Sequence, residues 1–398
     1  MIRQSSSPRR RRSPLALTAL LILLAGPLQA REGALHDALE AALARAEVTD
    51  SAGLPETGDW LSGLPSFTMA YYDSSERLGT DETELILNLP FKSASRRRLD
   101  DGLRALDAEL AAARETHRRW VYSGLVRERA WAIRLADLRQ AAMADKLALL
   151  TKLSTRIQRL AEGRAVPAYR GLIVERELLA AKLESSRLTS ERRASLAAWE
   201  ALTGSRATPA DLSEPGAPPA KLDFEEHPAL QLLDQVNGQQ QRLLALDAPG
   251  TAGWNLGLVA RNFDGPEFTD RQYGLSLELP LGFTGVENAG NLSARRSASR
   301  DYLLERDRLL LALRTEWEGL RAEADLLRQR QDLLSEAGQL ADRIQSQLER
   351  LDASSELEAE LLLQRMLDVL DTRAEAGLTE ALIGRNDARL RQAAGRSL

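Results

Sequence analysis

The sequence of 398 residues contains no cysteine, so it can form neither a disulfide framework nor a cysteine-ligated zinc site, nor carry an N-terminal lipid on cysteine. Its only histidines, His36, His117 and His227, do not have the spacing of metal ligands. Phosphate-binding loops, nucleophile elbows and zinc-protease motifs are missing as well. The sequence therefore gives no indication of an enzyme, a cofactor site or a metal centre.

Long apolar runs and aromatic residues are also scarce. After residue 30 no stretch approaches the roughly 18 consecutive apolar residues that a membrane-spanning helix needs. Aromatic residues make up 5% of the chain, while Leu, Ala, Arg and Glu dominate, which is typical of long helices and coiled coils. If the mature chain is embedded in a membrane, strands must therefore span it.

Residues 1–30 predict a secretory signal peptide. Arg3 and Arg9–Arg12 form a positive head, Leu15–Leu24 is an apolar segment too short to cross a bilayer, and Leu28-Gln29-Ala30 provides a cleavage site. An N-terminal amphipathic anchor is the alternative. Removing the segment changes the formal net charge from −5 to about −10, which argues against nucleic-acid binding.

Two strand pairs are expected, at 66–72 with 82–89 and at 254–261 with 272–281. Apolar and polar residues alternate along them, so each pair should have one apolar and one wetted face. Pro90 and Pro280 are expected to mark the exits into helices. If these strands span a membrane, the lipid-facing residues are Phe67, Met69, Tyr71, Leu85, Leu87, Leu89, Trp254, Leu256, Leu258, Leu275, Leu277 and Leu279.

Four short strands cannot form a complete structure in lipid. A two-stranded hairpin is unstable alone, and a transmembrane barrel needs at least about eight strands. Further copies of the chain must therefore complete the apolar wall. The aromatic residues crowd into these two regions, as they do in the interfacial girdles of barrels. A small soluble β layer packed on helices is the alternative.

Each strand pair is followed by a long helical pattern, a break and a return helix. The first helix is expected over 95–162 and returns over 169–202, with an apolar face that includes Leu172, Leu179, Leu183 and Leu196. The second keeps close to a seven-residue repeat, which favours a supercoiled seam. Its repeat positions are Leu313, Trp317, Leu320, Ala324, Leu327, Leu334, Ala341, Ile344, Leu348 and Leu351.

The two copies of this unit are spaced by about 190 residues, from Pro90 to Pro280. The expected divisions are a signal peptide (1–30), a short helix and loop (31–65), the first strand pair (66–91), the first helical hairpin (92–203), a linker with a short helix (204–253), the second strand pair (254–283) and the second hairpin (284–398).

Four phrases, in this order along the chain, carry a family resemblance: Arg159-Leu160-Ala161-Glu162-Gly163-Arg164-Ala165-Val166-Pro167, Leu202-Thr203-Gly204, His227-Pro228-Ala229-Leu230, and Gly274-Leu275-Ser276-Leu277-Glu278-Leu279-Pro280-Leu281. With the duplicated architecture, they resemble the TolC-type outer-membrane efflux factors, and most of all the heavy-metal (CzcC/CusC-like) branch that serves tripartite RND pumps. The resemblance covers about Gly33–Gly395. The helix before the first strand pair departs from the family because it is short.

The resemblance implies a mostly α fold with a small β part. It also implies a homotrimer whose twelve strands close a transmembrane β-barrel in the outer membrane of a Gram-negative bacterium. The helices would continue this barrel as an α-helical tunnel into the periplasm. The implied function is a passive efflux duct, whose partners are outer-membrane lipid, a periplasmic adaptor (membrane fusion) protein and an inner-membrane pump.

The family's hairpin tips dock the adaptor, and acidic residues ring its periplasmic entrance. The tips expected here are Gly163, Arg164, Ala165, Val166, Pro167, Asp352, Ala353, Ser354 and Ser355. Leu367-Asp368-Val369-Leu370-Asp371 copies the family's acidic motif, but counting back from Gly395 places the tip near Ser354 and makes Glu358 the better match. Asp368 and Asp371 are then interpreted as a polar helix face further from the tip.

Two other classes of protein remain possible from the sequence. A periplasmic adaptor also carries a long helical hairpin, but only one, whereas two are expected here. A soluble coiled-coil scaffold needs neither a signal peptide nor apolar-walled strands. The cargo is not indicated, because His, Met and Cys are scarce and metal transport would follow from the resemblance alone.

Overall fold

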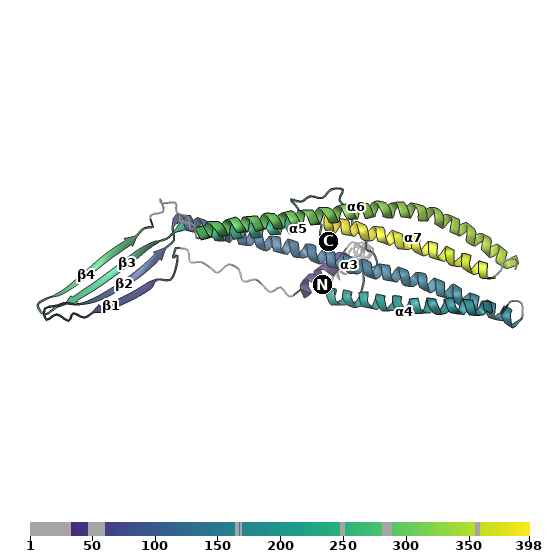
Figure 1. The fold of residues 1–398 in the computed structure, drawn as a ribbon, viewed down its shortest axis with the longest axis horizontal. Helices are drawn as coiled ribbons and strands as arrows, with labels where there is room; N and C mark the ends of the chain where they lie inside the picture. The colour runs from purple at the N-terminus through teal and green to yellow at the C-terminus, as the bar shows by residue number, and fades with distance from the viewer. Residues whose placement is uncertain are drawn as a thin grey trace, which may run out of the picture. The chain divides into compact units, whose positions relative to one another are not determined.

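The computed structural model describes residues 33–46, 60–163, 167, 169–246, 251–280, 289–354 and 359–398, so the expected signal peptide lies outside the described residues. Figure 1 shows the elements in chain order. They are α2 (Ala34–Arg45), β1 (Ser66–Tyr72), β2 (Asp81–Phe91), α3 (Ala94–Glu162), α4 (Tyr169–Thr203), α5 (Pro228–Ala245), β3 (Trp254–Asp264), β4 (Thr269–Glu278), α6 (Ala289–Ser354) and α7 (Ala359–Ala393).

The two halves of the chain repeat the same elements at nearly the same lengths. Helix α3 has 69 residues and α6 has 66, while α4 and α7 have 35 each. Both return helices are followed by a glycine with positive φ, Gly204 at 75° and Gly395 at 78°. Only glycine adopts this conformation without strain, so the same C-terminal stop occurs in both halves.

The chain divides into two compact units. One contains Arg119–Leu222 and Arg314–Leu398 together with the described residues 33–46, and we call it the bundle unit. The other contains the described residues of Val48–Arg118 and Asp223–Leu313, and we call it the sheet unit. Each unit is described separately below.

The sheet unit holds a single antiparallel sheet with the strand order β1-β2-β3-β4. The first residues of α3 connect to this sheet through a buried ion pair, because Lys92 Nζ lies 2.6 Å from Asp100 Oδ2 and both side chains are 5% exposed. Helix α5 joins the helices through Arg242, which donates to the Gly102 carbonyl (2.7 Å), and through Asp234, which accepts from the Tyr302 hydroxyl (2.7 Å).

The strand ends differ from the expected ones at both prolines. Strand β2 continues through Pro90 to Phe91, and Pro90 lies opposite Asn255 of β3. The first helix begins instead after Ser93, whose hydroxyl accepts from the Arg96 N–H (3.1 Å) as an N-cap. Strand β4 ends at Glu278, so Leu279 and Pro280 lie beyond it.

His227 caps α5, because its Nδ1 accepts a hydrogen bond from the Ala229 N–H (3.3 Å) and the side chain is fully buried. The role of this histidine in the described structure is therefore that of a helix cap. Burial, together with nearby His117, lowers the pKa of His227 to about 4 from its ordinary 6.5. The folded chain therefore holds His227 neutral at pH values where the unfolded chain protonates it.

The stability of the sheet unit should fall as the pH drops from 6.5 to 4 and should not depend on His227 above 6.5. The decrease in the free energy of unfolding that is due to His227 is expected to reach up to about 3 kcal/mol, because the unfolded state binds the proton more tightly than the folded state does. Thermal unfolding followed by circular dichroism at pH 7, 5 and 4 measures it. His227→Asn retains a cap acceptor that does not titrate, so its pH dependence should be shallower. Equal slopes in both proteins would contradict the assignment.

In the bundle unit the long helices pack around three clusters of buried apolar side chains. Trp199 of α4 lies in the first with Val126 and Ile133 of α3 and with α2. The second joins the ends of α3 and α4, and the third joins α6 to α7. Five of the expected seam positions in this part of α6 are buried: Trp317, Leu320, Ala324, Leu327 and Ala341.

The apolar face expected for α4 is wrong over most of its length. Leu172, Leu179 and Leu183 are exposed, at 67%, 60% and 76%. The helix instead buries the opposite positions, Val174, Ala181 and Leu188. Residues two apart in a helix lie about 200° apart, so α4 is apolar on two opposite faces, and the sequence could not say which of them packs inside one chain.

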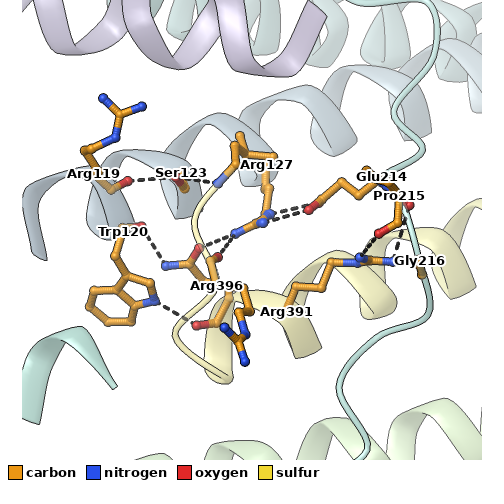
Figure 2. A network of polar contacts seen from close by, with 11 residues as sticks. Arg119, Trp120, Ser123, Arg127, Glu214, Pro215, Gly216, Arg391 and Arg396 are labelled. Carbon is orange, nitrogen blue, oxygen red and sulfur yellow. Dashed lines mark hydrogen bonds and ion pairs between the residues drawn. The ribbon is translucent and has the colours of Figure 1, made fainter. Parts of the chain in front are cut away.

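A polar network fixes the linker 204–222 and the C-terminus to α3 and α7 (Figure 2). Arg127 of α3, 3% exposed, donates to both Glu214 carboxylate oxygens (2.8 and 2.7 Å) and also to the Gln392 amide oxygen (2.7 Å) and the Arg396 carbonyl (2.8 Å). Arg391 of α7 donates to the carbonyls of Glu214, Pro215 and Gly216. The linker is therefore part of the packed unit.

Candidate functional site

The four-stranded sheet collects the apolar strand residues on one face. In an antiparallel sheet, residues paired across strands point to the same side. The register aligns Phe67, Leu87, Leu258 and Leu275 in one row across all four strands. Adjacent rows on the same face contain Met69, Leu85, Ala260 and Tyr273, and Leu89, Leu256 and Leu277. Except for Leu279, which lies beyond β4, the expected lipid-facing residues thus share one face.

This apolar face is open to the surroundings in the single chain. Phe67 is 65% exposed, Met69 66% and Leu275 77%, and every residue of β4 is exposed. Soluble monomers rarely expose a contiguous apolar surface of this kind, and such a surface marks a site of contact with lipid or with another protein.

The opposite face is more polar and contains ion pairs that join strands. Arg261 of β3 lies 2.6 Å from Glu84 and 3.5 Å from Glu82, both on β2. Asn255 donates to Glu278 across β3 and β4 (3.0 Å). Ile86 and Val259 also lie on this face, so it is mixed rather than uniformly polar.

Aromatic residues mark both ends of the apolar face. At the end nearest the helices Phe91 stacks on Trp254, with ring centroids 4.3 Å apart, and Trp60 lies 6.1 Å from Phe91. Near the opposite end Tyr71 lies in the row that contains Asn262 of β3. Eight residues of β3 separate these rows, about 26 Å at 3.3 Å per residue. An apolar band about 25 Å tall between aromatic girdles is typical of membrane-spanning barrels.

Strands β1 and β4 are the outer strands of the sheet, and within the described part of the chain each pairs with a single neighbour. Their outward backbone N–H and C=O groups are therefore available to another strand. An open edge beside an exposed apolar face makes the sheet incomplete in the single chain, since unpaired backbone groups are costly in an apolar environment.

The two helical hairpins end close to the expected tips. Helix α3 ends at Glu162, where the Gly163 N–H donates to the Arg159 carbonyl (3.1 Å), and α4 begins at Tyr169. Pro167 lies between these helices, while Arg164, Ala165 and Val166 are outside the described residues.

The expected second tip needs a correction. Helix α6 continues through Asp352 and Ala353 to Ser354, because this segment contains no glycine or proline that would stop it. Residues 352–354 of the expected tip are therefore the last residues of the helix rather than a break in it. Ser355 and Glu358 lie outside the described residues, and α7 begins at Ala359.

Asp368 and Asp371 both lie on α7, about three helical turns or less from its first residue. Both Asp371 carboxylate oxygens lie 3.2 Å from Lys146 Nζ of α3, and Asp368 pairs with Arg365 of its own helix (3.3 Å). The two acids are thus partnered and largely exposed in the single chain. No group of three or more acidic or histidine side chains able to hold a metal ion occurs among the described residues.

Sequence reasoning missed two features of the bundle unit, the ion-pair partner Glu214 and a row of exposed leucines on α6. Glu214 lies in a Pro/Gly/Ala segment that the sequence assigns to a linker, and no local pattern distinguishes it from a solvated acid. Leu326, Leu333 and Leu340 of α6 are exposed at 64%, 68% and 51%. Their seven-residue spacing is a second heptad pattern beside the expected one, so this signal was present in the sequence.

Comparison with known proteins gives matches to solved structures only. No protein-family model matches the sequence, and no curated protein matches it. The CmeC outer membrane channel of Campylobacter jejuni superposes with a TM-score of 0.62 at 14% identity, over 92% of this chain and 85% of CmeC.

Two further matches are of similar quality. CusC, a protein that forms a transmembrane channel, superposes with a TM-score of 0.61 at 14% identity, over 91% of this chain and 89% of CusC. The outer membrane protein VceC of Vibrio cholerae superposes with a TM-score of 0.58 at 15% identity, over 91% of this chain and 92% of VceC. The likeness shows that this chain has the fold of these proteins, mostly helical with a small sheet, as expected. None of the described helices is sufficiently long and apolar to cross a membrane.

Proposed function

We propose that this protein is the outer-membrane channel of a tripartite efflux system. In this proposal it is a passive duct that carries small molecules or metal ions from an adaptor and pump complex across the periplasm and the outer membrane. It breaks no bonds and binds no cofactor, and the energy comes from the inner-membrane pump. The observation that carries the proposal is the four-stranded sheet, with an exposed apolar face about 26 Å tall and two edges that no other described strand pairs with.

Closure of the sheet requires other copies of the chain. Strands alternate in direction, so β4 of one copy and β1 of the next can pair antiparallel. Three copies give a twelve-stranded barrel with no edge, above the minimum of about eight strands. The apolar face, including Phe67, Leu87, Leu258 and Leu275, then contacts lipid, and the face with Glu84 and Arg261 lines the lumen. The number of three copies follows from the family resemblance of the sequence phrases.

The helices of the three copies form the periplasmic tunnel in this proposal, and the two hairpin ends dock the adaptor. The first docking segment is 163–167 and the second lies around Ser354 and Ser355. The entrance acids are Glu358, with Asp371 and Asp368 further along α7. The four sequence phrases quoted above, which include Leu279-Pro280-Leu281, favour a pump of the heavy-metal branch. The genes that neighbour the gene for this chain would test this assignment.

The test is assembly and conductance of the whole chain expressed with its signal peptide. It should fractionate with the outer membrane and run as a trimer that boiling converts to monomers. The purified trimer should open ion-conducting channels in planar lipid bilayers. A monomer that is soluble without detergent, or a trimer without conductance, would contradict the proposal.

The two other classes of protein can be separated from a channel by the same measurements. A periplasmic adaptor or a coiled-coil scaffold would leave the apolar face of the sheet exposed to water, and neither needs channel activity. The described chain also contains two helical hairpins, α3 with α4 and α6 with α7, each following its own strand pair. This duplicated arrangement favours the channel.

A further inference from the structure

A cavity of about 580 Å³ lies in the bundle unit between the linker 204–222 and the two inner helices. The inner helices are α3 and α7, with α4 beside α3 and α6 beside α7 (Figure 1). The volume is within the range of about 300–1,000 Å³ that is typical of pockets for small molecules. None of the residues to which the proposed duct assigns a role lines this cavity, so its presence needs another explanation.

The linker forms one side of this cavity and is fixed by buried polar contacts (Figure 2). The Glu214 carboxylate accepts hydrogen bonds from two nitrogens of Arg127, whose side chain is 3% exposed. Arg391 lines the cavity as well, and it donates to the carbonyls of Glu214, Pro215 and Gly216. These contacts hold the linker in place without a ligand, so the cavity is preformed, as small-molecule sites usually are.

Small residues of α7 leave the space that the cavity occupies. Gly377, Ala381 and Gly384 all line it. A Cβ atom added at Gly377 would meet no other atom within 4 Å, so this position borders open space. A Cβ atom added at Gly384 would lie 2.4 Å from Cη2 of Trp131, so only glycine lets this indole ring of α3 extend across α7. The cavity therefore has an aromatic ring in its wall.

Two carboxylates of α7 line the cavity without a cation bound to them. Glu380 and Asp387 are seven residues apart, on the same face of the helix. Neither has a hydrogen bond or an ion pair with another described residue. Burial raises the pKa of Asp387, and nearby Arg328 and Arg391 oppose this shift. A negative charge in such surroundings is stabilised when a cation comes close to it.

The charge of the lining favours a cationic ligand over an anionic one. Of the two arginines that line the cavity, Arg391 donates to the linker carbonyls, and Arg134 of α3 is exposed to solvent. An anion would meet the two carboxylates of α7 at close range and would be repelled. A cation would be attracted by them and also by the face of the Trp131 ring, since aromatic faces bind quaternary ammonium groups well.

We propose that this cavity binds an organic cation with an apolar or aromatic body, of the quaternary or tertiary amine class. The charged group lies between the Trp131 ring and the carboxylates of Glu380 and Asp387, and the apolar part lies against Leu138 and Leu212, which also line the cavity. This inference goes beyond the proposed function and does not rest on it, because all of these residues belong to one unit of a single chain.

The test is isothermal titration calorimetry of the full-length protein, purified in a neutral detergent. The probes are benzyltrimethylammonium and phenylmethanesulfonate, an aromatic cation and an aromatic anion of similar size. We expect the cation to bind at one site per chain with a dissociation constant of about 0.1–1 mM, and the anion to bind at least about tenfold more weakly. The variant Glu380→Gln/Asp387→Asn removes both charges at nearly unchanged size and should weaken binding of the cation at least about tenfold.

Gly377→Leu places a side chain in the open space of the cavity and should abolish binding, while the helix remains because leucine favours it more than glycine does. The matched control is Gly171→Leu on α4, where an added Cβ atom also meets nothing within 4 Å but which does not line the cavity. It should bind the cation as the natural protein does.

Three results would overturn the proposal: no binding of the cation, binding of the anion with equal affinity, or unchanged affinity in Gly377→Leu. None of them would affect the proposed channel, because Gly377→Leu should still form a conducting trimer if the natural protein does.

Discussion

Replacing Arg127 by methionine is expected to lower the free energy of unfolding of the bundle unit by about 3–5 kcal/mol, because it leaves a buried carboxylate without its cation. Glu214 is 10% exposed at its side chain, and Arg127 supplies both of its charged hydrogen bonds. The same substitution leaves the Arg396 carbonyl and the Gln392 amide oxygen without this donor. Urea or thermal unfolding followed by circular dichroism measures the loss.

The removal of both partners should cost much less. In Arg127→Met/Glu214→Leu no buried charge remains, so most of the stability should return. Arg206→Ala is the matched surface control, because Arg206 also pairs with a glutamate, Glu200 at 2.9 Å, but is 86% exposed at its side chain. Its loss should stay below about 1 kcal/mol. Equal losses for Arg127→Met and Arg206→Ala would show that the network of Figure 2 contributes no more than a surface pair.

If the chain is the proposed channel, replacing Leu275 by arginine is expected to prevent its assembly in the outer membrane. Leu275 lies in the row with Phe67, Leu87 and Leu258, near the middle of the apolar face. An arginine at the lipid midplane costs about 2–4 kcal/mol, and a trimer would incur that cost in each of its copies. The amount of heat-dissociable trimer in the outer-membrane fraction should therefore fall sharply, with the monomer degraded or aggregated.

Ser276→Arg is the control for this prediction, because Ser276 is the next residue of the same strand and points to the opposite face. An arginine there would extend toward the lumen, and trimer levels should remain near those of the natural protein. A change of channel conductance without a change in assembly would agree with that position. If both variants assemble equally well, the apolar face does not contact lipid.

Much of the fold could be predicted from local patterns. Strand β1 occupies the expected residues, 66–72, and β3 begins at the expected Trp254. An alternation of apolar and polar residues over seven or more positions is typical of a β-strand. The return helices end at Thr203 and Ala393, and a glycine with positive φ follows one residue after Thr203 and two residues after Ala393.

The misses share a physical cause. At Pro90 the local rule against proline in a strand was overridden by pairing with Asn255. At Asp352–Ser354 small polar residues were interpreted as a turn, although nothing in them stops a helix. On α4 two apolar faces compete, and the choice between them depends on α3, which packs against Val174 and Ala181, while Leu172, Leu179 and Leu183 remain exposed.

The sequence by itself determined the duplication, the strand and helix types and the apolar alternation, because each depends on residues near one another in the chain. Only the tertiary structure decided which leucines remain exposed, that Glu214 pairs with Arg127, and that β1, β4, α4 and α6 are outer elements. These features depend on contacts between segments that are far apart in the sequence, and no local period encodes which partner a face will meet.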